Sequence, residues 1–155
     1  MALEQQPREQ PEQGGLNVGL LLFIPYRALE TRVFEALAAA GFDDFTPAQA
    51  RVMQRIGPGG TRLTELAEAA QVTKQTASFL VDQLERSGYV RRTPDPRDAR
   101  ARLVRIAERG LAAQPIADAA VHAVEAEWRA HLGERRWAQL REALTRLREI
   151  TDPYQ

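Results

Sequence analysis

Arginine side chains gather between residues 89 and 105, where the chain holds six arginines against two aspartates. A guanidinium group is always charged, and its planar fork suits bidentate hydrogen bonds to phosphates. The net charge of the whole chain is zero, which does not favour binding to a polyanion, but the local excess of positive charge marks a candidate surface for one. The alternative is an ordinary solvated hairpin. The six are Arg91, Arg92, Arg97, Arg100, Arg102 and Arg105.

A β-hairpin is the predicted carrier of these arginines. Residues 89–93 and 103–106 are short β-like runs, and residues 94–102 form a long turn-rich loop between them. An amphipathic helix between Thr73 and Gly88 precedes this hairpin. That order predicts a winged helix-turn-helix, with one helix for the major groove of DNA and an arginine-tipped loop for the neighbouring minor groove.

The residues before the hairpin supply both helices of that motif. A short helix is predicted at residues 63–70, with Leu66 and Ala67 facing inward, and a tight turn follows it. Thr73 is the predicted N-cap of the second helix. The buried stripe of this second helix has the i, i+3, i+4, i+7 spacing and consists of Ala77, Leu80, Val81 and Leu84.

The opposite face of the second helix is the predicted base-reading surface. Gln75 suits bidentate hydrogen bonds to adenine, and Ser78 can donate or accept. Thr73 and Lys74 lie at the helix N-terminus, which favours a phosphate. Phe79 has two interpretations, contact with a thymine methyl group or packing beneath the wing. For each of these residues the alternative is plain exposure to solvent.

Further helices are predicted on either side of the winged region, which spans about residues 46–106. The first covers about residues 17–40, and Pro25 is expected to kink or break it. Thr46 begins a capping box for a helix that runs to about residue 56. After the hairpin, residues 108–132 are helical with interruptions at Gly110 and Pro115, and a last helix covers about residues 134–150.

These outer helices carry more apolar surface than one small winged domain can cover, so we expect a homodimer. The last helix has a coiled-coil-like seam that includes Leu147. The alternative is a monomer whose terminal helices fold back on their own core. The side chains expected to need a partner are Leu21, Leu22, Phe23, Val33, Leu37, Trp128, Leu132, Trp137, Leu140 and Leu144.

In its helix order and in three short motifs, the chain resembles the MarR (multiple antibiotic resistance regulator) family of bacterial transcription factors. The motifs are residues 63–67 (LTELA), 84–90 (LERSGYV) and 98–100 (DAR). The resemblance implies a homodimer held by the terminal helices, which binds a pseudo-palindromic operator in double-stranded DNA. It also implies a repressor, commonly released by a small-molecule effector bound between the dimerisation and DNA-binding parts.

Within the wing, Asp98 and Arg100 match the pair found in this family. Arg100 suits a narrow, negative minor groove, and Arg97 is a second candidate for the tip. Asp98 repels phosphate, so we expect it to support the wing by accepting hydrogen bonds. The chain departs from the family at Phe79, near which a basic residue is frequent, and at Ala107, where a threonine commonly starts the next helix.

Some residues of the outer helices are candidates for an effector pocket or for metal ligands. Two histidine–carboxylate pairs, His122 with Glu125 and Glu127 with His131, have helical spacing, but surface ion pairs explain them better, so no metal is predicted. No Gly-rich phosphate loop, catalytic triad or distinctive carboxylate pair is present, so no enzyme and no cofactor are predicted. An effector pocket would be bordered by Phe23, Tyr26, Arg27, Phe45 and Trp128. The alternative is that these aromatic side chains are core or dimer contacts.

Composition agrees with a single folded unit. The length of 155 residues is enough for a real core, and the absence of cysteine excludes disulfides and thiol redox sensing. Residues 1–15 are predicted to be a disordered arm and residues 16–150 a single domain. We expect a mostly α cytoplasmic protein with a small β-hairpin wing, no membrane partner and a DNA-binding regulatory function. The alternative is a winged-helix protein-interaction module without specific DNA binding.

Overall fold

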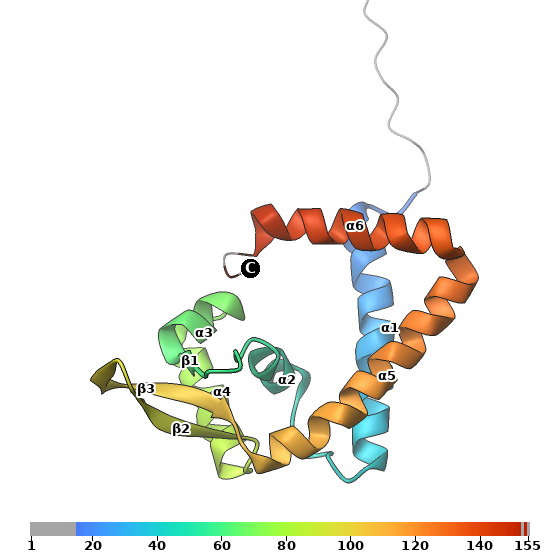
Figure 1. Cartoon of the computed structure of the whole chain (residues 1–155). Coiled ribbons are helices and arrows are strands. Elements are labelled where there is room, and N and C mark those ends of the chain that lie inside the picture. The colour runs from blue at the N-terminus through green and yellow to red at the C-terminus, as the bar shows by residue number, and fades with distance from the viewer. Residues whose placement is uncertain (1–14, 153, 155) are drawn as a thin grey trace, which may run out of the picture.

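The computed structural model describes residues 15–152 and 154, and it is mostly helical with one small antiparallel sheet, as predicted (Figure 1). Of the predicted disordered arm, all but Gly15 lies outside the described residues. Within the described part, no helix is long and apolar enough to cross a membrane. The elements are α1 (Val18–Ala39), α2 (Pro47–Met53), β1 (Thr61–Arg62), α3 (Leu63–Ala69), α4 (Lys74–Arg86), β2 (Val90–Asp95), β3 (Asp98–Ile106), α5 (Glu108–Leu132) and α6 (Glu134–Thr151).

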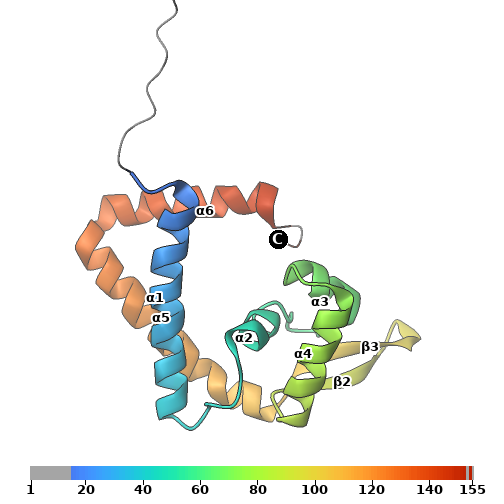
Figure 2. The same ribbon diagram turned by 180° about the vertical axis from the view of Figure 1, so that it is seen from behind.

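Two parts of the molecule are distinct in Figures 1 and 2. The helical frame consists of α1, α5 and α6, and the winged domain consists of residues 42–107. Helices α1 and α5 pack side by side. Gly133, with φ +80°, lets the chain turn between α5 and α6, so that α6 crosses back towards α3.

The predicted helix starts are confirmed. The Asn17 side chain accepts a hydrogen bond from the Leu20 amide (3.0 Å) at the start of α1. At α2 the capping box is complete, because the Thr46 hydroxyl accepts from the Gln49 amide (3.2 Å) and the Gln49 side chain accepts from the Thr46 amide (2.9 Å). Helix α2 ends at Met53, three residues earlier than predicted. Helix α5 starts at Ala107 without a side-chain cap, as expected.

Pro25 does not break α1, and the predicted interruptions of α5 are wrong. Pro25 lies inside α1 and Pro115 inside α5, and both helices continue through them. Both prolines are exposed, so water can hydrogen-bond the carbonyl that each leaves without a donor. Gly110 also leaves α5 intact. It lies where the helix meets the base of the wing, and a Cβ there would stand 2.5 Å from the Tyr89 carbonyl oxygen.

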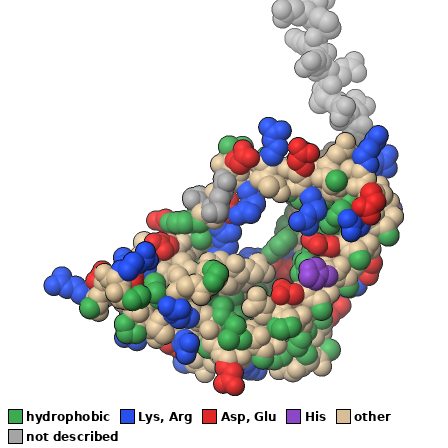
Figure 3. Space-filling view, viewed as in Figure 1, with side chains coloured by type: hydrophobic (Ala, Val, Ile, Leu, Met, Phe, Trp, Pro, Cys, Tyr) green, Lys and Arg blue, Asp and Glu red, His purple; other side chains and the backbone are tan. Residues whose placement is uncertain are grey.

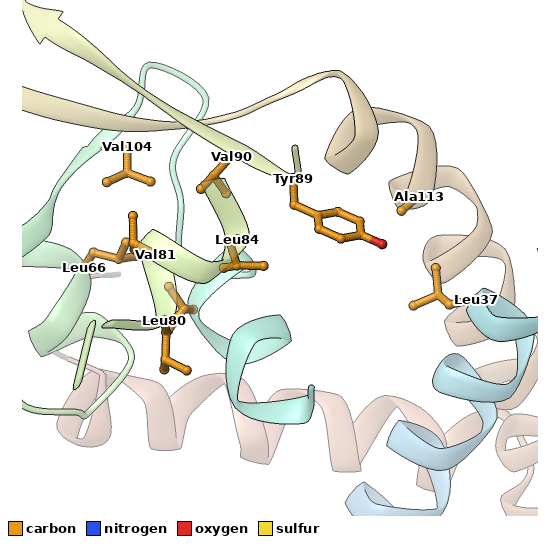
Figure 4. Packing of buried hydrophobic residues seen from close by; sticks show 10 residues of the cluster. Leu37, Leu66, Leu80, Val81, Leu84, Tyr89, Val90, Val104 and Ala113 are labelled. Carbon is orange, nitrogen blue, oxygen red and sulfur yellow. The ribbon is translucent and has the colours of Figure 1, made fainter. Parts of the chain in front are cut away.

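The core lies mainly inside the winged domain, where the predicted stripe of α4 is buried (Figure 4). Tyr89 extends this core to Leu37 of α1 and Ala113 of α5, so it joins the two parts. Its ring meets Phe45 edge-on with centroids 4.9 Å apart, and its hydroxyl donates to Asp44. Leu37 and Trp137 were expected to need a partner subunit, but both are buried within this chain.

The sheet differs from the prediction in two ways. Its strand order is β1-β3-β2, and β1 was not predicted because it has only two residues. The wing is a long β2–β3 hairpin with a tight turn at Pro96 and Arg97, in place of the predicted loop over residues 94–102. Arg100 and Arg102 therefore lie on strand β3.

Candidate nucleic-acid interface

Helix α4 presents a polar outer face above its buried stripe. The Thr73 hydroxyl accepts from the Thr76 amide (3.1 Å), which fixes the helix start. Lys74 and Gln75 are exposed in the first turn, and Ser78 is half-buried one turn further on. The free amides and the dipole of the first turn favour an anion, so this end of α4 has the properties of a phosphate site.

A buried carboxylate closes the turn of the wing. Asp95 is almost fully buried, and it accepts hydrogen bonds from the Arg97 amide (2.9 Å) and from Arg62 Nε of β1 (2.8 Å). The backbone hydrogen bond from Arg97 and then the Arg62 side chain hold the pKa of Asp95 below its usual value. Asp98, by contrast, is exposed and accepts from the Arg100 amide (3.1 Å).

The arginines of the wing divide into paired and unpaired groups. Across the described residues, Arg91, Arg100 and Arg102 are exposed and have no carboxylate within 4.0 Å. The Arg97 side chain at the turn is 83% exposed, with Asp95 as a distant partner at 3.7 Å. Figure 3 shows basic side chains at the end of the projecting hairpin. These four cations can reach a ligand, which satisfies the first requirement for binding phosphate.

The sequence places Arg92 among the wing arginines, but in the structure it is paired with carboxylates of α4. Its guanidinium contacts Glu85 (2.5 Å) and Asp82 (2.7 Å), both on α4. Arg105 donates to the Thr93 hydroxyl (3.0 Å) within the hairpin. These two arginines therefore stabilise the hairpin and its junction with α4, and the free positive charge of the wing is smaller than the residue count suggests.

Residues 43–101, which contain this helix pair and most of the wing, match the sequence model of the MarR family. The winged helix-turn-helix of this chain belongs to the MarR family. Its fold is that of transcriptional regulators, which supports a role in DNA binding.

Solved structures extend the likeness beyond the MarR-family domain. Transcriptional regulator PA4135 is 26% identical, with a TM-score of 0.68 over 88% of this chain and 98% of its own. Transcriptional regulator Tm0710 from Thermotoga maritima is 27% identical, with a TM-score of 0.57 over 85% of this chain and 92% of its own. The apo form of MarR from E. coli shares the fold at 23% identity, with a TM-score of 0.66 over 86% and 98%. No curated protein matches this chain. PA4135 and Tm0710 are both described as transcriptional regulators.

The predicted effector residues do not come together in one pocket. Tyr26 donates to buried Glu30 (2.7 Å), and Arg27 also contacts Glu30. Phe45 belongs to the aromatic core around Tyr89, and Phe23 is 55% exposed on α1. Trp128 is half-buried on α5.

Glu30 is the centre of an ion-pair cluster that sequence reasoning missed. Arg51 of α2 contacts it at 3.1 Å, opposite Arg27. Burial opposes ionisation of Glu30, but hydrogen bonds from Tyr26 and Arg51 and the two guanidinium charges outweigh it and lower its pKa. An open groove of about 400 Å³ lies beside this cluster, lined by residues that include Arg27, Glu30, Phe34, Phe42 and Pro47.

The histidine–carboxylate pairs have other partners. Glu127 forms a two-pronged ion pair with Arg32 of α1 (2.9 and 3.0 Å), and Glu125 contacts Arg141 of α6 (3.4 Å). Within residues 15–152, no group of three His, Cys, Asp or Glu side chains could hold a metal ion. These carboxylates instead tie the helices of the frame together.

Sequence reasoning found the exposed residues of α4 and the wing but missed the pairs that position them. Asp95 and Arg62 close the wing, although they are 33 positions apart. The sequence does carry a signal for Asp95, because an aspartate two residues before the Arg97 amide is typical of an Asx turn. Arg62 has no such signal, since β1 is too short to show a pattern.

Proposed function

We propose that this chain is a DNA-binding transcriptional regulator that acts as a homodimer on a pseudo-palindromic operator. The observation that carries the proposal is the polar face of α4 beside a hairpin with unpaired, exposed arginines. The MarR-family match and the two transcriptional regulators of similar fold support it.

In this proposal α4 enters the major groove and the wing follows the adjacent minor groove. Gln75 and Ser78 contact base edges, while Thr73 and Lys74 bind a phosphate at the helix N-terminus. Arg97 at the turn and Arg100 on β3 supply charge to the minor groove. Asp98 orders the start of β3 through its hydrogen bond from the Arg100 amide.

The helical frame supports the dimer. Large apolar side chains along α1 and α6 are exposed, including Leu21 and Phe23 (55% each), Leu144 (39%) and Leu147 (43%). Figure 3 shows an opening between α6 and the winged domain, with apolar side chains at its margin. An apolar surface of this extent needs a partner. A two-fold axis through the frame would set two α4 helices about 34 Å apart, as a palindromic site requires.

The proposed regulator is a repressor that a small ligand releases from DNA. The groove beside Glu30 lies between α1 and the start of α2, and it can admit a small molecule. A ligand that displaced Arg51 from Glu30 would shift α2. That shift would reach α4 through the hydrogen bond from Gln49 to Gln83 (2.9 Å). The expected cytoplasmic location stays a prediction.

Two measurements test the proposal. Light scattering on the purified chain should give the mass of a dimer. Fluorescence anisotropy with a labelled duplex should show an affinity that falls linearly with log[salt], because each phosphate contact releases counterions. A salt-independent or absent interaction would favour the alternative, a winged-helix module that binds another protein.

A further inference from the structure

Phe79 is the one apolar exception on the surface of the winged domain. Across residues 42–107, all of which the structure describes, it is the only large hydrophobic side chain that is exposed, at 58%. A single exposed hydrophobic residue is ordinary on most surfaces. Phe79, however, lies in the middle of α4 on the face proposed to read bases.

The neighbours of Phe79 leave its ring uncovered. Gln75 lies one turn earlier on the same face and is exposed. Asp82, three residues later, is held by Arg92 of β2 at 2.7 Å, so the hairpin contacts α4 beyond the phenyl ring. The aromatic and cation–π contacts among the described residues do not include Phe79. The suggestion that it packs beneath the wing is therefore wrong.

Few groups in the major groove of DNA can make a favourable contact with a phenyl ring. Base edges there present hydrogen-bond donors and acceptors, and the C5 methyl group of thymine is the apolar exception. A ring pressed on a donor or acceptor removes it from water without replacing the hydrogen bond, which is unfavourable. Contact with a methyl group buries apolar area on both partners.

We propose that Phe79 is a specificity-determining residue that recognises thymine through its 5-methyl group. This assignment rests on the proposed function, in which α4 enters the major groove. Residues four apart are separated by about 6 Å along a helix, which corresponds to about two base-pair steps of DNA. The contacted thymine therefore lies within about two positions of the base that Gln75 reads.

The test removes only the methyl groups. The full-length chain is used to enrich a duplex from a randomised pool, and that duplex is then remade with deoxyuridine in place of every thymidine. The wild-type chain should bind the uracil duplex about fourfold more weakly for each contacted methyl group, hence about tenfold or more with one contact in each half-site. Phe79→Ala should weaken binding to the thymine duplex and abolish the difference between the two duplexes.

Phe79→Leu is the matched control, because leucine keeps an apolar contact and should retain a preference for thymine. Since Phe79 is exposed, both variants should keep the thermal midpoint of the wild-type chain. Equal wild-type affinity for the two duplexes would overturn the assignment, and so would an undiminished thymine preference in Phe79→Ala. If no duplex is enriched from the pool, the proposed function itself fails at that earlier step and the assignment fails with it.

Discussion

Apart from Phe79, the large apolar side chains of the winged domain are buried or half-buried, whereas α1 and α6 of the helical frame carry theirs on the surface. Leu66, Val81 and Leu84 are at most 1% exposed, while Leu140 and Leu144 of α6 are 36% and 39% exposed. The winged domain thus buries its own core within one chain. The frame has no equivalent core of its own.

This difference in burial distinguishes leucines of α4 from leucines of α6, although their spacing in the sequence is similar. Leucines at helical spacing occur both in α4 and in α6, yet only those of α4 are covered. Burial in the winged domain depends on α2, α3 and the sheet closing over α4. In the frame, α6 diverges from α5 beyond their junction (Figure 1), so a second chain would have to cover its seam, as the proposed dimer requires. Substitutions in the seam of α6 should therefore affect folding more than substitutions in the winged domain.

Charged substitutions in the seam of α6 give the largest expected effect. Leu140→Asp combined with Leu144→Asp places two carboxylates in the proposed dimer interface, where they would lose water without gaining partners. We expect an unfolded or aggregated chain, because the interface acts as the core of the frame. Circular dichroism, calorimetry and light scattering measure this outcome.

The matched control places aspartates on the other side of the same helix. Ala138→Asp with Thr145→Asp should leave a folded dimer, since both positions are exposed and lie off the seam. A well-folded monomer from the Leu140 and Leu144 variant would show that the frame is stable alone, and the contrast between the two regions would disappear.

A truncation in the winged core should have a smaller effect. Leu84→Ala removes a side chain that is 1% exposed and leaves a cavity, which costs about 2–5 kcal/mol of the free energy of unfolding. Leu111→Ala, at a position that is 58% exposed in α5, should cost far less. Urea unfolding at one fixed protein concentration compares them. Equal losses would mean that α5 is as enclosed as α4.

In the proposed complex, α4 and the wing should contribute differently to DNA binding. Gln75→Ala should weaken binding to the enriched duplex by about 1–3 kcal/mol, with little effect on random DNA, because it removes a base contact. Arg100→Ala should weaken binding to both duplexes and reduce the salt slope by about one. Anisotropy titrations at several salt concentrations measure both quantities.

Arg92→Ala is the control for charge, because Arg92 is already paired with Asp82 and Glu85. Its salt slope should change by less than that of Arg100→Ala. If Gln75→Ala reduced the two affinities equally, its role in base reading would be refuted. An unchanged slope for Arg100→Ala would remove the wing from the DNA contacts.

Much of the fold follows from local sequence signals. Thr46, Thr73 and Asn17 are helix caps in the sequence and in the structure, and the stripe of α4 is buried as its spacing predicts. Such features depend on residues within one or two turns of each other, so the sequence displays them. The winged helix-turn-helix class could be predicted for the same reason.

The features that sequence reasoning missed depend on contacts between distant residues. Strand β1 exists because β3 pairs with it, and Asp95 at the tight turn of the wing is paired with Arg62, which lies 33 positions earlier in the sequence. The arginine cluster showed where cations are, but it could not show that Arg92 is paired with α4. The continuity of α1 through Pro25 likewise depends on solvent exposure, which the sequence does not reveal.

Substitution of Asp95 at the turn of the wing should have an effect of intermediate size. Asp95→Asn keeps the shape of the side chain but removes the charge that Arg62 and the Arg97 amide contact. We expect a looser turn and a severalfold loss of DNA affinity, with the dimer unaffected. Asp98→Asn, at an exposed position, should have less effect. If the Asp98 variant bound DNA more weakly than the Asp95 variant, the support of the wing would be assigned to the wrong aspartate.

The smallest expected effect concerns one of the contacts between the helical frame and the winged domain. Asp152, at the end of α6, accepts hydrogen bonds from Arg55 beyond α2 (2.5 and 3.1 Å) and from Arg148 (3.0 and 3.2 Å). The hydrogen bonds from Arg55, aided by those from the Tyr154 amide and Arg148, outweigh burial and lower the pKa of Asp152 from 3.8 to about 2. Since the folded-state pKa is depressed, this contact stabilises the fold fully above about pH 4 and is lost as the pH falls towards 2.

Asp152→Asn should therefore lower the urea midpoint slightly at pH 7, and the difference from the wild-type chain should shrink as the pH falls from about 4 through 2. Glu149→Gln, an exposed neighbour on α6, controls for the loss of one negative charge and should show no such pH-dependent difference. A midpoint difference for Asp152→Asn that persists unchanged at pH 2 would mean that the amide disturbs packing. In that case the ion pair between Asp152 and Arg55 would not help to hold the helical frame against the winged domain.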